Sequence, residues 1–355
     1  MRPTIPNVGW SRGALEPVHL CPACGSAKRD ARQYSRHDDG GVMPDVWRMV
    51  RCGDCRSLYL DPRPAAESLP RAYLDYYTHQ AEHEDAPEGG AGGLVWSLVH
   101  GYLNWRFGMR RTPSNKFGAL VFSAIEPLRL KLDYYGRHLA RAQFPQPGRL
   151  LDVGCGNGAF LLRAREMGWN VAGCEPDAKA VSACQAQGLD VIRGDVFSSA
   201  LDGELFDVVT ISHVLEHVTD PQALLKRAKA LMNPGGVLWV ALPNPHSLGL
   251  RIFGAAWRGL HVPFHLCIPS QARLGRWMET TGFVSIQLKR RGAHSKRLWS
   301  DSTVIAHREQ IAIRSRATVV LLRLVTDFLA TLTPRWAEET VMIAYKPETS
   351  NAGRM

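Results

Sequence analysis

The stretch LLDVGCGNGAF, residues 150–160, joins an apolar segment to a turn that contains Gly154, Gly156 and Gly158. A strand that passes through such a turn into a helix presents backbone N–H groups at the start of the helix, where an anionic ligand can bind. Glycines let the backbone approach that ligand closely. The spacing is D-x-G-x-G-x-G rather than G-x-G-x-x-G, which disfavours an NAD-linked oxidoreductase. The stretch therefore predicts an α/β fold that holds a nucleotide cofactor.

The segments that follow alternate apolar strands with helices, the pattern of a parallel sheet in an α/β fold. Gly168, Gly188 and the residues 234–236 end three of these helices. The predicted strands cover residues 149–153, 170–174, 189–193, 206–211, 236–242, 283–289 and 341–346. The predicted helices cover residues 158–167, 177–187, 221–232 and 270–281.

Acidic residues stand at the ends of the predicted strands. Glu175 ends the second strand, 23 residues after Asp152, where a carboxylate can accept both hydroxyls of a ribose. Asp195 follows the third strand, where it is expected near an adenine ring. The fourth strand leads into SHVLEHV, residues 212–218, and the fifth ends in ALPNP.

These ordered motifs resemble the class I S-adenosylmethionine-dependent methyltransferases, over residues 137–290 and 339–347. The resemblance implies a Rossmann-like sheet of seven strands whose last strand is antiparallel, and S-adenosyl-L-methionine as the cofactor. It implies that Asp152 and the glycine loop hold the methionine part, Glu175 the ribose, and Asp195 with Val196 the adenine. The expected cofactor contacts are Asp152, Gly154, Cys155, Gly156, Gly158, Glu175, Pro176, Asp195, Val196, Ser212 and His213. The sulfonium makes the methyl group electrophilic, so the protein mainly aligns the acceptor and excludes water.

The histidines of SHVLEHV are candidates for a base or a metal site. If the segment is helical, His213, Glu216 and His217 share one face. The motif resembles the E-x-x-E-H of ubiquinone-biosynthesis O-methyltransferases and small-RNA 2′-O-methyltransferases, which implies a divalent metal. Here His213 stands in place of the first acid, and a lost carboxylate weakens a site for a hard cation.

Two further candidate histidines, His261 and His265, lie in the segment WRGLHVPFHLCIPS, residues 257–270. The expected catalytic residues are His213, His261 and His265, because an oxygen acceptor needs a group that takes its proton. A divalent metal at Glu216 and His217 is a less favoured alternative. In the other alternative Glu216 and His217 have a structural role, and the segment HVPFHL lies over the substrate as a lid.

Two C-x-x-C pairs open the chain, Cys21 with Cys24 and Cys52 with Cys55. Four thiolates can close a tetrahedral Zn²⁺ site, which folds its segment rather than catalysing a reaction. The 27 residues between the pairs exceed the commonest spacing, and a redox dithiol explains one pair but not two. The scattered cysteines are expected to be small buried hydrophobes, namely Cys155, Cys174, Cys184 and Cys267.

The charge and the two amphipathic segments bear on the partners. The formal net charge is +10, and residues 289–335 hold ten Lys or Arg against three acids, which attracts anionic partners or forms a solvated face. The segments 94–135 and 295–335 are expected to cap the active site, with a membrane interface as the alternative. Residues 1–20 lack a secretory signal and no apolar run is long enough to span a membrane. The expected location is the cytoplasm, with peripheral membrane contact left open.

The predicted domains are a zinc-ribbon-like N-terminal module at 1–79, a linker and amphipathic helical segment at 80–136, the methyltransferase core at 137–347 with a helical insertion at 295–335, and a tail at 348–355. The leading interpretation is a methyltransferase that O-methylates a small molecule, a sugar, or a glycan- or lipid-linked intermediate. The alternatives are an RNA or other nucleic-acid methyltransferase, which is not favoured, and a non-catalytic cofactor-binding regulator. The absence of N-P-P-Y and D-P-P-Y after the fourth strand counts against N-methylation of bases.

Overall fold

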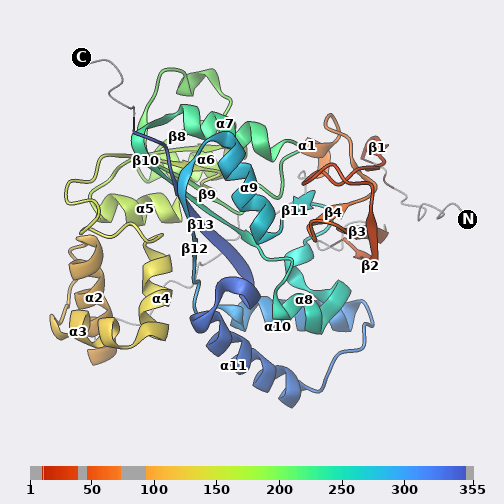
Figure 1. Ribbon diagram of the computed structural model, residues 1–355. Helices are drawn as coiled ribbons and strands as arrows, with labels where there is room; N and C mark the ends of the chain where they lie inside the picture. Colours follow the sequence, from red (N-terminus) through yellow and green to blue (C-terminus); the bar gives the residue numbers. More distant parts are fainter. Residues whose placement is uncertain (1–9, 11, 39–45, 73–92, 349–355) are drawn as a thin grey trace, which may run out of the picture.

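The fold is organised around a seven-stranded sheet (Figure 1). A computed structural model of the protein describes residues 10, 12–38, 46–72 and 93–348. The strands of the sheet lie in the order β12-β13-β10-β9-β6-β7-β8. Their bounds are β6 Arg149–Val153, β7 Asn170–Glu175, β8 Asp190–Arg193, β9 Phe206–Ser212, β10 Met232–Pro243, β12 Val284–Lys289 and β13 Glu339–Tyr345.

The strand pairing confirms the predicted class I sheet. β6 pairs in parallel with β7 and β9, and β9 pairs in parallel with β10. β13 is antiparallel to both β10 and β12, so the last strand is inserted between two strands that precede it in the chain. β10 begins at Met232 rather than at 236, because Met232 already pairs with Phe206, and the preceding helix ends at Ala230 rather than at 232.

Helices cover both faces of this sheet. α7 (Pro221–Ala230) and α9 (Gln271–Thr281) pack on one face, whereas α5 (Ala159–Glu166) and α6 (Ala178–Ala186) pack on the other. Three of these helices begin at a residue whose side chain accepts a hydrogen bond from the first turn: Asp177, Asp220 and Ser270. Both faces being covered explains why the parallel strands are almost continuously apolar.

The N-terminal segment forms a smaller sheet in the order β11-β4-β3-β2. Its strands are β2 Arg29–His37, β3 Val46–Cys52, β4 Leu58–Leu60 and β11 Cys267–Ile268, and beside it lie the pair β1 Leu15–Glu16 and β5 Arg63–Pro64 and the short helix α1 Leu69–Ala72. Trp47 and Tyr59 are buried in the same hydrophobic cluster as Trp257 of the core. The N-terminal sheet is therefore packed onto the core, which supplies one of its strands. Most of the predicted linker at 80–93 lies outside the described residues.

The two amphipathic segments form helices at the lower end of the molecule in Figure 1. The first predicted helix is α2 (Leu94–Phe107), and the apolar stretch 117–132 divides into α3 (Phe117–Ala124) and α4 (Glu126–Tyr135). The later insertion contains α10 (Ser295–Arg308) and α11 (Arg316–Leu332). α8 (Leu248–Phe253), which follows the carboxyl end of β10, lies at the same end of the molecule.

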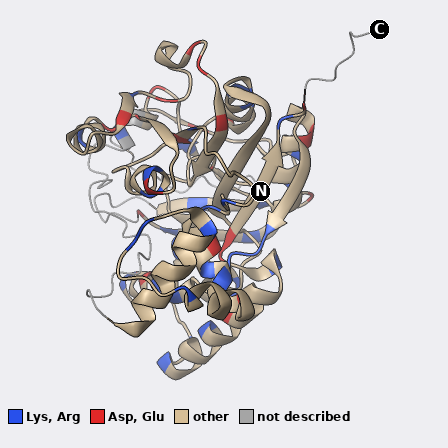
Figure 2. Ribbon diagram, turned by 90° about the vertical axis from the view of Figure 1, so that its left-hand side faces the viewer, with Lys and Arg blue, Asp and Glu red and all other residues tan. Residues whose placement is uncertain are grey.

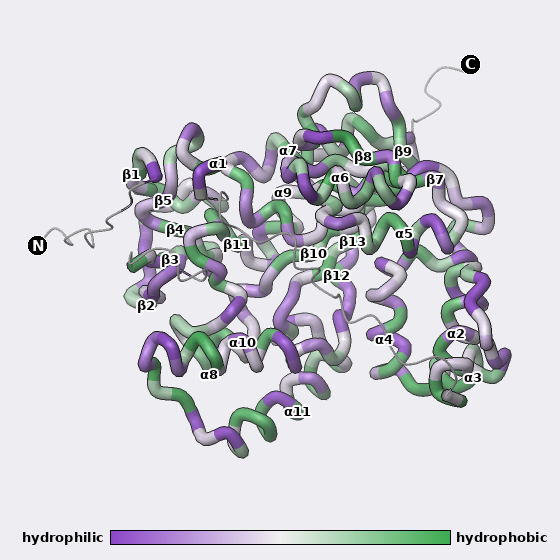
Figure 3. The backbone as a smooth tube through the Cα atoms, turned by 180° about the vertical axis from the view of Figure 1, so that it is seen from behind, coloured by the Kyte–Doolittle hydropathy of each residue, from purple (hydrophilic) through white to green (hydrophobic). Residues whose placement is uncertain are grey.

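The helix α11 turns its apolar face outward. Leu321, Phe328 and Leu332 are 62%, 60% and 57% exposed, whereas Thr326 and Ala330 are buried. Figure 3 shows further hydrophobic stretches on α2 and α3, where Leu94, Phe117 and Leu120 are exposed among other residues. Among the described helices, none is long and apolar enough to cross a membrane.

Candidate functional site

The glycine loop forms a cradle at the carboxyl end of β6. Gly154, Gly156 and Gly158 have φ values of 66°, 53° and 78°, the left-handed conformation that favours glycine. A side chain at Gly154 would meet Val214 at 2.5 Å, whereas a Cβ at Gly156 would meet nothing within 4 Å. The loop is therefore closed on its protein side and open at Gly156, where a ligand can approach the backbone.

Two predicted cofactor acids lie at neighbouring strand ends beside this loop. The Glu175 carboxylate accepts hydrogen bonds from the N–H groups of Gly156 and Asp177, both at 3.0 Å, and burial raises its pKa. The N–H of Gly194 donates to the Glu175 carbonyl, which ties the end of β8 to the end of β7. Asp195 follows there, and its carboxylate accepts from the N–H of Phe197. The predicted ribose and adenine residues therefore line one edge of the sheet.

Asp152, the third predicted acid, is held by a residue that the sequence did not single out. Arg137 Nη1 lies 2.5 Å from Asp152 Oδ1, and Thr210 donates a hydrogen bond of 2.7 Å to the same oxygen. The Arg137 guanidinium also stacks 3.6 Å from the centre of the Phe160 ring. Arg137 and His138 have φ values of 47° and 60°, which are strained for these residue types. Neither a motif nor a periodicity marks Arg137, so sequence reasoning missed it.

His213 stands directly after β9 and is held between two carboxylates. Its Nδ1 lies 3.2 Å from Glu216 Oε1 and its Nε2 lies 3.1 Å from Glu339 Oε1. Burial by itself lowers the pKa of His213, but the hydrogen bonds to Glu216 and Glu339 raise it well above its ordinary value. A protonated imidazole can donate protons but cannot accept one, so this arrangement suits orientation and charge balance better than the role of a base.

The segment that carries His213 is a turn rather than a helix. The prediction that His213, Glu216 and His217 share a helix face is therefore wrong, because His217 packs instead against His265, with ring centres 4.6 Å apart. The segment 261–266 is likewise buried, and the N–H of Leu266 donates to the Glu216 carbonyl at 2.7 Å. It is thus part of the interior of the described chain.

His217, His261 and His265 form a cluster whose candidate ligand atoms lie within 4.8 Å of one another. The Nδ1 atoms of His217 and His265 lie 3.1 Å and 2.9 Å from the carbonyl oxygens of Phe264 and Gly259, which orients both rings. Burial lowers the pKa values of His261 and His265 well below the ordinary value, so both rings are neutral.

Glu216 completes this cluster with a carboxylate. Its Oε1 lies 3.9 Å from His265 Nε2. Its Oε2 is buried and has no hydrogen-bond partner among the described residues, an arrangement that is costly unless a ligand takes it up. Three imidazoles and one carboxylate are donors that fit a divalent transition metal better than Mg²⁺.

The four N-terminal cysteines also come together. Cys21 Sγ lies 3.7 Å from Cys55 Sγ, and Cys24 Sγ lies 3.6 Å from Cys52 Sγ, with all four sulfurs within 4.8 Å. A tetrahedral Zn²⁺ with bonds of about 2.3 Å separates its sulfur ligands by about 3.8 Å. Gly25 and Arg56, which follow the two pairs, are both left-handed, with φ values of 75° and 63°. The donor set and the spacing therefore fit structural zinc.

Two adjacent acids connect the site to the helical insertions: Glu338, which precedes β13, and Glu339, which begins it. No sequence motif marks either residue. Glu339 accepts from Arg291 Nε at 2.7 Å, and the Arg291 guanidinium lies over the Tyr134 ring of α4. Glu338 accepts from the indole N–H groups of Trp257 and Trp299, both at 2.8 Å. These contacts tie α4 and α10 to Glu339 and Glu338, and Glu339 in turn contacts His213.

Comparison with known proteins agrees with this geometry. Residues 129–288 match a family model described as a methyltransferase domain. The ubiquinone biosynthesis O-methyltransferase of Bordetella avium is 31% identical over 177 residues, which are 45% of this chain and 69% of the relative. The protein of the same name from Cereibacter sphaeroides is 34% identical over 143 residues, 36% of this chain, and the chain spans only 58% of that relative.

Among solved structures, a SAM dependent methyltransferase from Archaeoglobus fulgidus is 21% identical, with 64% of this chain and 94% of that chain covered and a TM-score of 0.41. The residues that the family model matches contain the glycine loop, Glu175 and the turn after β9. The chain belongs to the class I S-adenosylmethionine-dependent methyltransferases.

Proposed function

We propose that the protein transfers the methyl group of S-adenosyl-L-methionine to an oxygen atom of a small-molecule, sugar or lipid-linked acceptor. The observation that carries this proposal is the glycine loop beside Glu175, with a histidine cluster after the neighbouring strand β9. The proposal places the cofactor and the acceptor at the carboxyl ends of the neighbouring strands β6 and β9, and an in-line displacement needs the two close together. The names of the curated relatives support an oxygen acceptor.

On the cofactor side, the glycine loop and Asp152 hold the methionine part, Glu175 and Pro176 the ribose, and Asp195 with Val196 the adenine. Ser212 and His213 close the cleft from the end of β9. The open position at Gly156 supports this assignment, because it leaves room against the backbone.

On the acceptor side, His261 and His265 take the proton of the acceptor hydroxyl or hold the metal that makes this hydroxyl more acidic. The lowered pKa of both rings favours the metal-holding role, because a metal binds neutral imidazole, and it makes each ring a weaker base. His217, His261, His265 and Glu216 would hold the divalent ion, which when bound lowers the pKa of an oxygen ligand. His213, fixed as a cation between Glu216 and Glu339, positions the carboxylate of Glu216 next to that cluster.

The N-terminal module, residues 1–79, binds structural zinc through Cys21, Cys24, Cys52 and Cys55. The helical segment at 80–136 and the insertion at 295–335 are separate additions to the core at 137–347, and 348–355 is a tail. The outward apolar faces of α3 and α11 contact an anionic membrane surface, because Lys116, Arg314 and Arg316 are exposed at their N-terminal ends. Figure 2 shows Lys and Arg residues along the helices at this end of the molecule.

The test measures cofactor binding and turnover separately. Calorimetry should show binding of S-adenosylmethionine but not of NAD, and the protein should release S-adenosylhomocysteine with one member of a panel of phenols, glycans and RNA. His265→Ala and His213→Ala should each reduce turnover at least tenfold while cofactor binding is retained. Failure to bind S-adenosylmethionine contradicts the proposed function, and turnover with RNA alone selects the nucleic-acid alternative. If both variants keep normal turnover, the histidine assignment is wrong.

A further inference from the structure

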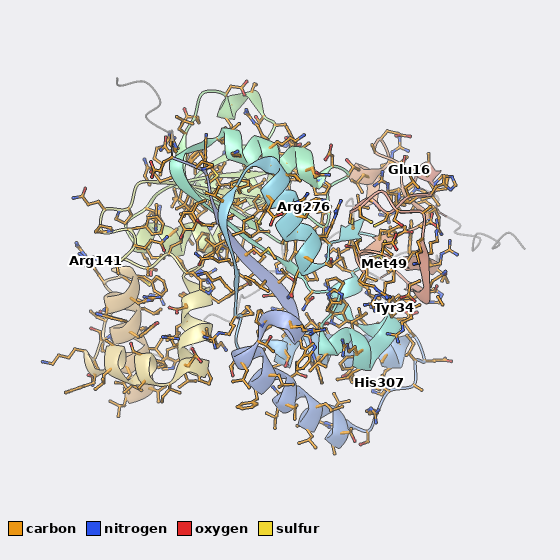
Figure 4. All side chains as sticks on the ribbon, viewed as in Figure 1. Glu16, Tyr34, Met49, Arg141, Arg276 and His307 are labelled. Carbon is orange, nitrogen blue, oxygen red and sulfur yellow. The ribbon has the colours of Figure 1, made fainter. Side chains whose placement is uncertain are left out.

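A cavity of about 330 Å³ lies where the N-terminal sheet meets the segment after β10. Its lining includes Arg32, Tyr34 and Arg51 from β2 and β3, and Pro245, His246 and Arg251 from the segment before α8 and from α8 itself. Figure 4 labels Tyr34 at the side of β2 that lies next to α8. The volume is in the range of small-molecule sites in proteins.

The charge of this cavity is positive. Three arginines line it and no acidic residue does. The pKa of His246 is lowered to about 4, and burial has the largest effect on it. The positive charges of Arg51 and Arg251 shift this pKa in the same direction. The neutral His246 ring adds a hydrogen-bonding group without adding to the repulsion among the arginines.

The arginines of the cavity are unpaired within the part of the chain that the structure describes. Arg32, Arg51 and Arg251 make no side-chain hydrogen bond or ion pair with another described residue, and Arg51 Nε is buried without a partner. The nearby acid Asp30 does not line the cavity; it pairs with Arg56 at 2.5 Å and accepts a hydrogen bond from the backbone N–H of Arg32, and the charges of Arg51 and Arg32 contribute to lowering its pKa. Arg32 and Arg251 are exposed and Arg51 is half-buried, so the three guanidinium groups form a positive cluster that an anionic ligand can reach from solvent.

The cavity lies beside the segment that follows the carboxyl end of β10. Pro245 and His246 follow β10, and β10 pairs with β9, which ends at Ser212 beside His213. The glycine loop and Glu175, in contrast, lie across β9 at the ends of β6 and β7. An anion in this cavity is therefore not part of the cofactor.

We infer that this cavity binds a phosphate or diphosphate group of the methyl acceptor through Arg32, Arg51 and Arg251. The inference rests on the proposed function, since it assigns the acceptor to the class of phosphate esters. A guanidinium matches two phosphate oxygens at once, and three of them match a group that carries more than one negative charge. Tyr34 and His246 donate or accept the remaining hydrogen bonds.

The experiment is calorimetry of the full chain with inorganic pyrophosphate at physiological salt, with malonate as a carboxylate probe. We expect pyrophosphate to bind, malonate to bind much more weakly, and Arg51→Gln and Arg251→Gln each to weaken pyrophosphate binding by about tenfold or more. Arg251 is exposed, so Arg251→Gln is expected to fold normally even if Arg51→Gln does not. Arg110→Gln, an exposed arginine outside the cavity, is the matched control and should leave binding unchanged.

S-adenosylmethionine binding is measured on the same samples. If the cofactor binds and pyrophosphate does not, or if Arg251→Gln binds pyrophosphate as tightly as the unchanged protein, the inference is overturned while the proposed function stands. Equal affinity for malonate and pyrophosphate also overturns it, because the ligand class is then carboxylate. Loss of cofactor binding in the unchanged protein counts against the proposed function, whatever pyrophosphate does.

Discussion

Replacing Arg137 by methionine should destabilise the protein far more than breaking an equally short ion pair on its surface. The Arg137 and Asp152 side chains are 5% and 2% exposed, and the pair is 2.5 Å long. Methionine retains much of the apolar contact with Phe160 but leaves the Asp152 carboxylate buried with Thr210 as its remaining side-chain donor. Removing one partner of a buried pair costs about 3–5 kcal/mol, because the other charge is left uncompensated.

The control is Glu204→Gln. Arg149 and Glu204 also lie 2.5 Å apart, but their side chains are 43% and 42% exposed. Solvent screening reduces such a pair to about 0–1 kcal/mol, so the two variants differ in burial and not in distance. Urea unfolding of both variants, and of Asp152→Asn alone and with Arg137→Met, measures the free energies and the coupling between the two residues.

We expect the double variant to be less destabilised than the sum of the single variants, because it removes both buried charges. A loss below about 1 kcal/mol for Arg137→Met, or strict additivity of the two substitutions, would refute the reasoning that burial sets the strength of this pair.

Three further predictions concern zinc, pH and lipid. Cys52→Ser should abolish bound zinc and lower the unfolding midpoint, whereas the control Cys174→Ala should keep its zinc. Elemental analysis measures the bound zinc, and zinc retained by Cys52→Ser would contradict the Cys₄ site. Burial raises the pKa of Glu338 from 4.5 to about 7, so the folded state keeps a proton that the unfolded state has lost, and the free energy of unfolding should fall as the pH rises from about 4.5 to 7. In Glu338→Gln the free energy of unfolding, measured by denaturant titration, should depend less on pH over this range. An unchanged pH dependence would mean that other groups cause it. The protein should float with phosphatidylcholine–phosphatidylglycerol vesicles and not with phosphatidylcholine alone, and Phe328→Glu should reduce flotation; a protein that never floats has no such membrane contact.

The conformation of the loop that we propose for the cofactor could be predicted from the sequence because its determinants are local. Gly154, Gly156, Gly158 and Glu175 lie in or next to turns whose conformation the adjacent strand and helix impose. The same locality made the strand positions predictable, and the errors at β10 and α7 are confined to element ends.

The acceptor half depends on contacts between distant segments, which spacing does not reveal. His217 meets His261 and His265 only because residues 214–217 form a turn, whereas their spacing equally allows a helix. Arg137 and Glu339 lie in stretches without a motif, so only the folded chain shows that they contact Asp152 and His213. The sequence also left open whether the apolar face of α11 packs on the core or faces outward. Periodicity gives the width of an apolar face and not the side of the helix that contacts the core.

The smaller sheet has a consequence for how the protein matures. Its strands β2, β3 and β4 are made early in synthesis, but the edge of β4 stays open until Cys267 and Ile268 leave the ribosome and add β11. An unpaired strand edge invites association with other chains, so the N-terminal segment is exposed to such association until β11 is added. Early zinc capture by Cys21, Cys24, Cys52 and Cys55 would hold β3 and β4 in place during that wait.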